Sequence, residues 1–370
     1  MNWGLLLFSL FTAVTLIQII YYIVVFRPVA LYTPPPREHS QTHPVSVVIC
    51  SRDEDENLAR NLPGVLVQHY PTTHEVIVVN DNSLDDSKYV LAELQKKFRQ
   101  LQIVALEQET KWLPGKKFPL SIGIKESKHE ILLLTDADCT PASEHWVAKM
   151  QEAFAPGIEV VLGYGAYHKL PGVLNKIIRW ETFHTALQYF GFALTGLPYM
   201  GVGRNLSYRK ELFFRNKGFS SINHLPGGDD DLFINKVAHK NNTAIVLDPD
   251  AFTLSMPKRT WKDWVRQKKR HFTTGKYYKR SHRFLLGLYS ASQVLFYLLF
   301  ILSIIFFDWR WSLIPFVMGL AVKGVVLKKA AQKLGEADLW KWFPLLDVWM
   351  CVYYIIFAPA LWRKPGKSWK

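Results

Sequence analysis

The chain has 370 residues, of which 49% are hydrophobic, and a formal net charge of +14. Its apolar residues are segregated, because residues 4–26 and residues 284–307 contain no charged side chain. Each segment is long enough to cross a hydrocarbon core of roughly 30 Å. This pattern excludes a wholly soluble enzyme and argues against a multi-span transporter, while the stretch of roughly 250 residues between the two segments is large enough for one substantial core.

The first apolar segment is expected to be a retained transmembrane anchor over residues 1–27. No basic region precedes it, and residues 26–29 offer no small-residue cleavage site, so it does not resemble a signal peptide. A Pro-rich linker is expected over residues 28–43. The three cysteines are far apart in the sequence, so they predict neither a disulfide framework nor a zinc site.

Most of the positive charge lies in one segment, residues 257–283, which carries eleven Lys or Arg against Asp263 alone. A basic segment directly before a membrane helix marks the cytoplasmic side and attracts anionic lipids. We therefore expect a basic juxtamembrane segment here, a cytoplasmic domain over residues 44–256, and membrane lipids rather than nucleic acid as the partner of these charges. The expected location is the cell (inner) membrane, with several crossings and the amino terminus outside.

The C-terminal region, residues 284–370, is expected to cross the membrane at 284–307 and to return over residues 311–327. The apolar stretch 339–362 is less regular, because it contains two charged and two proline residues and ends in a basic tail at residues 363–367. A fourth crossing would place that tail outside. The sequence therefore leaves two alternatives open for this stretch: a re-entrant or interfacial helix, or a further span.

The middle domain alternates short β-branched runs with helical patterns, which predicts an α/β fold with a doubly wound, mostly parallel sheet. In such sheets ligands bind outside the carboxyl ends of the strands. The predicted strands and helices follow in chain order. The strands are 45–50, 75–80, 102–106 and 131–135, and the helices are 57–68, 86–99 and 116–127.

Acidic residues follow three of these strands: Asp53 and Glu54 after the first, Asp81 after the second, and Asp136 and Asp138 after the fourth. Helix capping is the alternative role for such residues. Two carboxylates two positions apart at a strand end repel each other unless a cation lies beside them. Asp136 and Asp138 therefore predict a Mg²⁺ or Mn²⁺ site shared with phosphates.

A second acidic cluster, residues 229–231, precedes a helical pattern. It could complement a helix dipole, but mutual repulsion would also raise the pKa of at least one carboxyl, as a general base requires. Further along, Gln267, Arg270 and His271 lie in the basic segment. That segment is typical of an amphipathic helix at a membrane surface, and Arg270 could also neutralise a diphosphate leaving group, with His271 beside it.

Together these motifs resemble the family 2 inverting glycosyltransferases, specifically the membrane-anchored branch that includes cellulose and hyaluronan synthases. The resemblance spans roughly residues 44–271 and implies a GT-A fold. Thr135-Asp136-Ala137-Asp138 is similar to the Asp-x-Asp motif of that family, which assigns Asp138, with Asp136, to the metal. The resemblance implies contacts with the nucleotide-sugar donor for a further set of residues. These are Asp53, Glu54, Asp81, Lys117 and Asp136.

The Gly-Asp-Asp stretch of hyaluronan-type synthases resembles Gly228-Asp229-Asp230, and this register implies Asp230 as the catalytic base, with Asp229 as the alternative. Processive members carry Gln-x-x-Arg-Trp where this chain has Gln267 to His271. Because that Trp helps to hold the acceptor, its replacement by His271 argues against polymer synthesis.

These features predict transfer of one sugar from a nucleotide-diphosphate sugar, with uridine favoured by the resemblance, to a lipid-linked or saccharide acceptor. One alternative is a processive synthase that extrudes its product. A second is a catalytically silent membrane adaptor that keeps the fold for binding, because fold does not imply activity.

Overall fold

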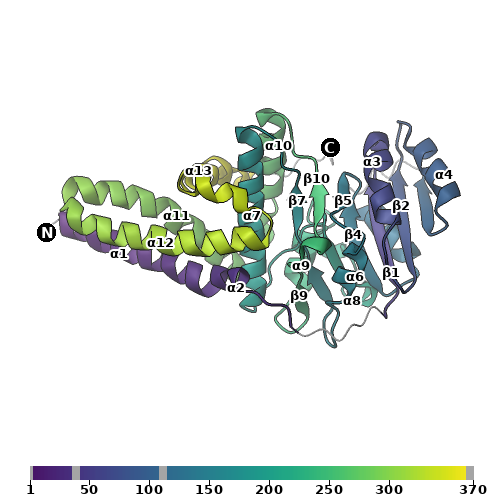
Figure 1. Ribbon diagram of the computed structural model, residues 1–370, viewed down its shortest axis with the longest axis horizontal. Helices are drawn as coiled ribbons and strands as arrows, with labels where there is room; N and C mark the ends of the chain where they lie inside the picture. The colour runs from purple at the N-terminus through teal and green to yellow at the C-terminus, as the bar shows by residue number, and fades with distance from the viewer. Residues whose placement is uncertain (1–2, 36–41, 108–114, 364–370) are drawn as a thin grey trace.

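The computed structural model describes residues 3–35, 42–107 and 115–363. It has two parts, an α/β domain built around a central sheet and a helical bundle that extends from one side of that domain (Figure 1). The basic tail expected at residues 364–367 and part of the Pro-rich linker, residues 36–41, lie outside the described residues.

The central sheet has seven strands in the order β3-β2-β1-β4-β8-β6-β9. The first four are mutually parallel, as predicted, whereas β8 runs antiparallel to both β4 and β6. The strands are β1 (Val45–Ser51), β2 (His74–Asp81), β3 (Leu101–Leu106), β4 (Ile131–Asp136), β6 (Val160–Leu162), β8 (Leu206–Arg209) and β9 (Thr243–Ile245).

Both faces of the sheet are covered by helices, which explains why its central strands are almost continuously apolar. Val47 and Ile49 of β1 pack with α3, α4 and α6, whereas Val48 and Cys50 point to the opposite face and pack with α5. The doubly wound α/β class is therefore confirmed. The helices of the domain are α3 (Asp55–Leu66), α4 (Ser87–Lys97), α5 (Lys117–Glu126), α6 (Trp146–Gln151), α8 (Lys210–Arg215) and α9 (Asp231–Val237).

A small second sheet follows directly from the end of β4. Its strand order is β5-β10-β7, in which β10 (Thr253–Ser255) runs antiparallel to β5 (Cys139–Pro141) and parallel to β7 (Gly165–Tyr167). Because β5 begins only three residues after Asp136, this sheet forms one wall beside the carboxyl ends of the main strands.

The bundle contains three long helices that lie side by side in Figure 1: α1 (Trp3–Ile20), α11 (Arg280–Phe306) and α12 (Trp309–Lys333). The first continues through a π-helical turn, Tyr21–Phe26, into α2 (Arg27–Ala30), so the linker expected from residue 28 begins only after Ala30. Four segments of the described chain are long and apolar enough to cross a membrane. Three of them contain these long helices, and the fourth is Ala337–Trp362.

The fourth segment is broken into a 3₁₀ turn, α13 (Phe343–Phe357) and a second 3₁₀ turn. Both of its ends contact the domain side of the bundle. At its start Glu336 and Asp338 bind Arg179, and at its end the Arg363 carbonyl accepts a hydrogen bond from Lys276 at 2.9 Å.

Two helices join the domain to the bundle: α7 (Val173–Leu194), which is largely buried, and α10 (Trp261–Phe272), which forms the middle of the basic juxtamembrane segment. α10 begins where the Thr260 hydroxyl accepts the Asp263 N–H at 3.2 Å, a regular N-cap. A buried ion pair between Lys268 of α10 and Glu181 of α7 holds the two helices together.

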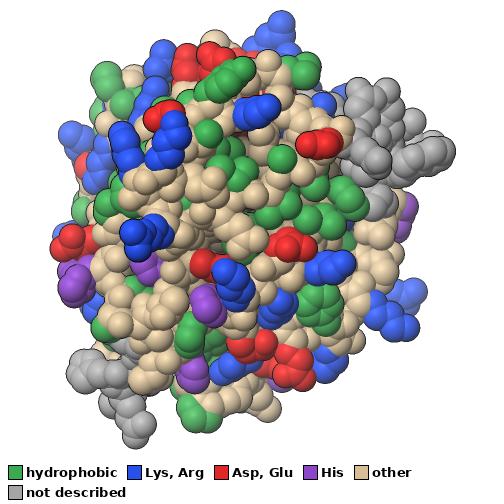
Figure 2. All heavy atoms as spheres, turned by 90° about the vertical axis from the view of Figure 1, so that its right-hand side faces the viewer, with side chains coloured by type: hydrophobic (Ala, Val, Ile, Leu, Met, Phe, Trp, Pro, Cys, Tyr) green, Lys and Arg blue, Asp and Glu red, His purple; other side chains and the backbone are tan. Residues whose placement is uncertain are grey.

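The face of the domain that lies farthest from the bundle carries interspersed basic and acidic side chains (Figure 2). No broad area of that face carries charge of only one sign. The excess of positive charge belongs instead to the segment that joins the domain to α11.

Helix α5 packs so closely on the sheet that Gly123 has no room for a side chain. A Cβ atom there would lie 2.7 Å from Val48 Cγ1 and 2.9 Å from Val79 Cγ2. Since β-branched side chains are stiff, we expect Gly123→Ala to lower the free energy of unfolding by about 1–3 kcal/mol. Thermal or denaturant unfolding would measure this loss. Ser121→Ala, a change of similar size on the same helix, is the control, and equal stability of the two variants would contradict the packing argument.

Candidate active site

The carboxyl ends of β2, β1 and β4 meet at one edge of the sheet because these strands are parallel neighbours. In the β1–β4 register Cys50 lies opposite Asp136, and in the β1–β2 register Ser51 lies opposite Asn80, directly before Asp81. The structure therefore brings together the acidic residues that follow the three strands, as the topology predicts.

The loops after β1 and β2 are hydrogen-bonded to each other. The Asp53 N–H donates to Ser83 Oγ at 3.0 Å, and the Leu84 N–H donates to Asp53 Oδ1 at 2.8 Å. Asp53 has a positive φ of 51°, a conformation that few residues other than Gly, Asn and Asp adopt. Asp81 lies near Arg52, with 3.8 Å between Oδ2 and the guanidinium, and burial raises the pKa of Asp81 against the opposing effect of Arg52.

Asp136 forms an ion pair with Lys116, the residue directly before α5. Burial alone would raise the pKa of Asp136, but Lys116, Arg204 and Arg270 together hold it below its usual value. Lys117, which the resemblance assigns to the donor, is buried and donates instead to the Leu225 carbonyl. Of the two adjacent lysines, it is therefore Lys116 whose ammonium group reaches the Asp-x-Asp pair.

Asp138 completes a compact donor set with Asp136 and Cys139, whose candidate ligand atoms all lie within 4.8 Å of one another. Burial and repulsion by Asp136 raise the pKa of Asp138, which is the electrostatic condition that a bound cation would relieve. Two carboxylates with open coordination positions suit Mg²⁺ or Mn²⁺ held together with phosphate oxygens. Cys139 is engaged with Ser255 Oγ at 2.9 Å, so the carboxylates are the better ligands. The residues present thus fit the expected metal.

Arg204 is a cation of this site that the sequence analysis does not single out. Its guanidinium lies 4.3 Å from the centre of the Tyr167 ring and donates to the Ala166 carbonyl at 3.3 Å. It also acts electrostatically on Asp136 and Asp138. Residues 200–209 resemble an acceptor-side stretch of the family, but that resemblance does not place Arg204 beside the Asp-x-Asp pair, which it approaches through the antiparallel β4–β8 pairing.

Asp230 is the N-cap residue of α9, and backbone groups hold its carboxylate in place. The Gly203 N–H donates to Oδ2 at 2.8 Å, and the Asp231 N–H donates to Oδ1 at 2.7 Å. Burial, followed by repulsion from Asp229 and Asp231, nevertheless raises the pKa of Asp230 to about 8. Such a carboxyl is tuned to exchange a proton near neutral pH.

The neighbours of Asp230 differ from it in environment. Asp231 points toward the segment after α10, where its Oδ2 accepts hydrogen bonds from Thr274 at 2.5 Å and from Tyr278 at 2.8 Å. Asp229 is half-buried and lies close enough to Lys116 and Lys117 to interact electrostatically with both. Asp231 therefore anchors α9 to the juxtamembrane segment, whereas Asp229 and Asp230 face the cations of the site.

Helix α10 brings a third cation, Arg270, to the site. Arg270 is exposed and acts electrostatically on Asp136, and Gln267, half-buried, lies one turn earlier on the same helix. His271 is exposed, and the nearby protein atoms and then the positive charges of Lys268 and Arg270 lower its pKa. A neutral imidazole at this position can still donate one N–H hydrogen bond.

The order of these elements matches a known family. Residues 46–214, which include the Asp-x-Asp pair and Arg204, match the model described as "Glycosyl transferase family 2". This domain belongs to glycosyltransferase family 2. The matched segment ends before Asp230 and α10. The family match therefore does not cover them, and their proposed roles depend on their positions in the structure.

Two known proteins are similar in sequence to this chain. The chain is 26% identical over 249 residues to a probable glycosyltransferase, YdaM, of Bacillus subtilis, covering 63% of this chain and 56% of that protein. It is 30% identical over 142 residues to the poly-beta-1,6-N-acetyl-D-glucosamine synthase of Staphylococcus epidermidis, covering 38% of this chain and 33% of that protein. The chain thus spans between a third and just over half of the length of these relatives.

A solved structure resembles the glycosyltransferase domain and the bundle together. It is the mannosyltransferase PcManGT from Pyrobaculum calidifontis in complex with GDP-Man and Mn²⁺, which superposes with a TM-score of 0.60 and 20% sequence identity. The match covers 96% of this chain and 98% of that one. At this identity the similarity concerns the fold, which is the GT-A fold implied by the sequence.

If Asp230 is the base of a sugar transfer, its raised pKa predicts how the rate depends on pH. Because a base must be ionised to accept a proton, we expect kcat/KM to rise with pH up to about 8, the pKa of Asp230 in the ligand-free site. Removing a neighbouring negative charge lowers that pKa, so Asp229→Asn should move the rising limb of the profile to lower pH. Asp250→Asn, on an exposed turn, is the control and should leave the limb in place. Complete inactivation of a folded Asp229→Asn protein would instead identify Asp229 as the base.

Proposed function

We propose that this protein is a membrane-bound, inverting glycosyltransferase. It transfers one sugar from a nucleotide-diphosphate sugar to a hydroxyl of a lipid-linked or saccharide acceptor. The observation that carries the proposal is the convergence of the Asp136–Asp138 pair, the high-pKa carboxyl of Asp230 and the cation Arg270 at one edge of a family 2 domain.

The proposed donor site lies along the strand ends. Asp53, Glu54 and Asp81 would contact the nucleoside there, and Asp136 and Asp138 would hold Mg²⁺ or Mn²⁺. The metal, when bound, supplies positive charge that stabilises the diphosphate as it leaves. In this proposal Lys117 has a supporting role. Its ammonium group donates a hydrogen bond to the Leu225 carbonyl and so holds the segment that leads to Asp229 and Asp230.

In the proposed reaction Asp230 removes the proton of an acceptor hydroxyl, and the resulting oxygen attacks the anomeric carbon from the face opposite the diphosphate. The new carbon–oxygen bond forms as the bond to the diphosphate breaks, so the configuration inverts. Arg270 and the N–H of His271 are placed to stabilise the departing nucleoside diphosphate, with Gln267 on the same side of α10.

The bundle supports a single transfer rather than polymer extrusion. A channel for a growing chain needs several helices around a polar path. The contact between α1 and α11 is instead closed, by buried Phe11, Phe296 and Leu299 and by the hydrogen bond from Gln18 to Ser292 at 2.7 Å. His271, which stands where processive members of the family carry Trp, also favours a single transfer. A silent adaptor would not need a carboxyl whose pKa is raised to about 8 beside a metal-type pair.

The decisive assay is the release of nucleoside diphosphate by the purified full chain. The donors are UDP-, GDP- and dTDP-sugars, each with Mn²⁺, Mg²⁺ or EDTA. GDP-mannose is included because the structural neighbour was solved with it. We expect one donor to react only with metal, and Asp138→Asn and Asp230→Asn to lower the rate by at least about 100-fold. Asp250→Asn is the matched control. Binding of nucleotide without release, even when lipid extracts are added as acceptors, would favour the adaptor.

We further propose three membrane crossings, by α1, α11 and α12, with the domain on the cytoplasmic side. The rings of Phe8 and Phe307 stack at 4.8 Å, which puts the start of α1 beside the α11–α12 connection. Both ends of the α13 segment would then lie on the cytoplasmic side with the basic segment, as the distribution of positive charge requires.

Cysteine labelling tests this topology, since the three native cysteines are buried. Arg363→Cys and Lys262→Cys should react with an impermeant maleimide only in inside-out vesicles, and Trp309→Cys only in intact cells or right-side-out vesicles. Labelling of Arg363→Cys together with Trp309→Cys would make α13 a fourth span.

A further inference from the structure

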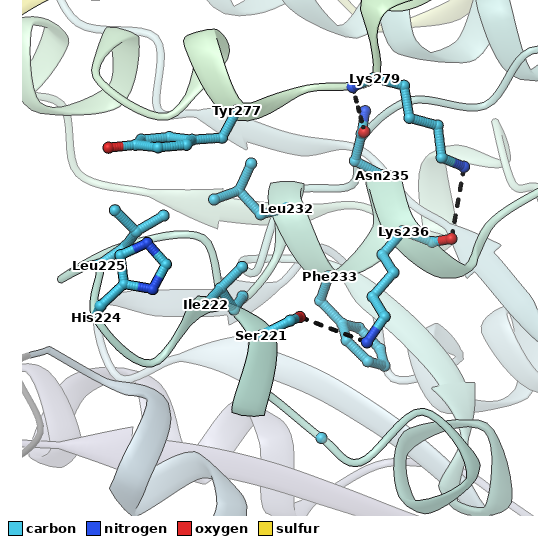
Figure 3. Close-up of a pocket in the computed structure, with 11 residues that line it drawn as sticks. Ser221, Ile222, His224, Leu225, Leu232, Phe233, Asn235, Lys236, Tyr277 and Lys279 are labelled. Atoms are coloured by element: carbon cyan, nitrogen blue, oxygen red, sulfur yellow. Dashed lines mark hydrogen bonds between the residues drawn. The ribbon is translucent and has the colours of Figure 1, made fainter.

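A pocket of about 340 Å³ lies beside α9 and is separate from the candidate active site (Figure 3). None of the residues assigned above to donor, metal or base lines it. Its inner surface is apolar and includes Ile222, Leu225 and Leu232, while Tyr277 and His224 close one side with ring centres 6.4 Å apart.

The opposite side of this pocket carries two lysines, Lys236 and Lys279. Lys236 Nζ donates to the Asn216 carbonyl at 3.1 Å. It also donates to Ser221 Oγ at 3.4 Å, and Lys279 Nζ donates to the Lys236 carbonyl at 3.5 Å (Figure 3). These partners are neutral, and no acidic residue is among those that line the pocket in the described part of the chain. The pocket therefore combines an apolar interior with positive charge that has no carboxylate partner there.

The position of the pocket determines which ligands reach it. Lys279 directly precedes α11, and its N–H donates to Asn235 Oδ1 at 2.9 Å, so the pocket is fixed at the point where the chain enters the bundle. If α11 crosses a membrane, this point lies at the level of the lipid headgroups. An apolar cavity with a cationic rim at that depth is complementary to an amphiphile with an anionic head.

We propose that this pocket binds an anionic phospholipid, with the phosphate between Lys236 and Lys279 and the first part of the lipid against Ile222, Leu225 and Leu232. Bound lipid would contact α9, the helix capped by Asp230, and the segment of Tyr277 and Lys279 at once. The inference rests on the proposed membrane placement of α11 but not on the proposed sugar transfer, so a test that requires no activity can fail independently of that function.

The test measures access to the pocket in the full chain reconstituted into nanodiscs. Ser221→Cys places a reactive thiol on the rim, where the native residue is exposed, and the native cysteines are buried. We expect the rate of alkylation by a maleimide to fall as phosphatidylglycerol replaces phosphatidylcholine in the disc. Since one cation near a surface contributes about 1 kcal/mol, Lys236→Gln and Lys279→Gln should each raise the phosphatidylglycerol fraction that gives half-protection by about fivefold.

Lys262→Gln is the matched control, because it removes one charge from an exposed lysine of the same basic segment that lies outside the pocket. This variant should leave the phosphatidylglycerol fraction that gives half-protection unchanged. A change as large as that caused by Lys236→Gln or Lys279→Gln would overturn the proposal, because it would indicate general attraction of anionic lipid by the basic segment. Ile222→Trp, which fills the apolar interior, should make the rate independent of lipid composition. Equal rates in both lipids, or protection by inorganic phosphate alone in phosphatidylcholine discs, would also overturn it.

Discussion

Repulsion among carboxylates at one sheet edge is the constraint on which this structure depends. Acidic side chains from three strand ends and from α9 approach one another in partly buried positions, and such groups are costly unless cations accompany them. The cations come from distant parts of the chain: Lys116 from the segment before α5, Arg204 from the segment before β8, and Arg270 from α10. The edge is therefore complete only when the domain and the juxtamembrane helix are docked together.

That docking depends on contacts outside the site. The buried pair of Lys268 and Glu181 fixes α10 against α7, and the Trp264 ring packs on Tyr353 and Phe357 of α13. Removing one partner of a buried ion pair leaves an uncompensated charge and typically costs about 3–5 kcal/mol. Asp231 also accepts hydrogen bonds from Thr274 and Tyr278, which link the helix capped by the proposed base to the segment after α10.

The sequence was sufficient for the parts of the fold that local patterns determine. The four parallel strands were predicted to within one or two residues, because long apolar runs bounded by acidic turns leave few alternatives. The short strands β6, β8 and β9 have only three or four residues each, too few to show a period, and pairing across the sheet defines them. The buried helix α7 was not predicted either, because Arg179, Glu181 and His184 interrupt its apolar residues and leave no regular apolar stripe in the sequence.

The same distinction applies to the site. Asp136, Asp138 and Asp230 were found because acidic residues at strand and helix ends are visible in the sequence, although their roles stay proposals. The choice between Lys116 and Lys117 depends on which side chain points to the strand ends and which points into the core, and a lysine pair does not reveal that orientation. The path of the last apolar segment depends on the pairing of Lys323 with Asp347 at 3.1 Å, between residues on different helices.

The aromatic contact between α10 and α13 also limits how such chains can diverge. Trp264, Phe272, Tyr353 and Phe357 form one surface, half of which belongs to the helix beside the proposed reaction centre and half to an apolar segment long enough to reach a membrane. A lineage that adapts its apolar segments to a thicker or thinner bilayer must keep this face of α13 or change α10 in compensation. Selection for membrane composition and selection for turnover therefore act on the same side chains, and a chimaera of two relatives should exchange α10 together with the membrane helices.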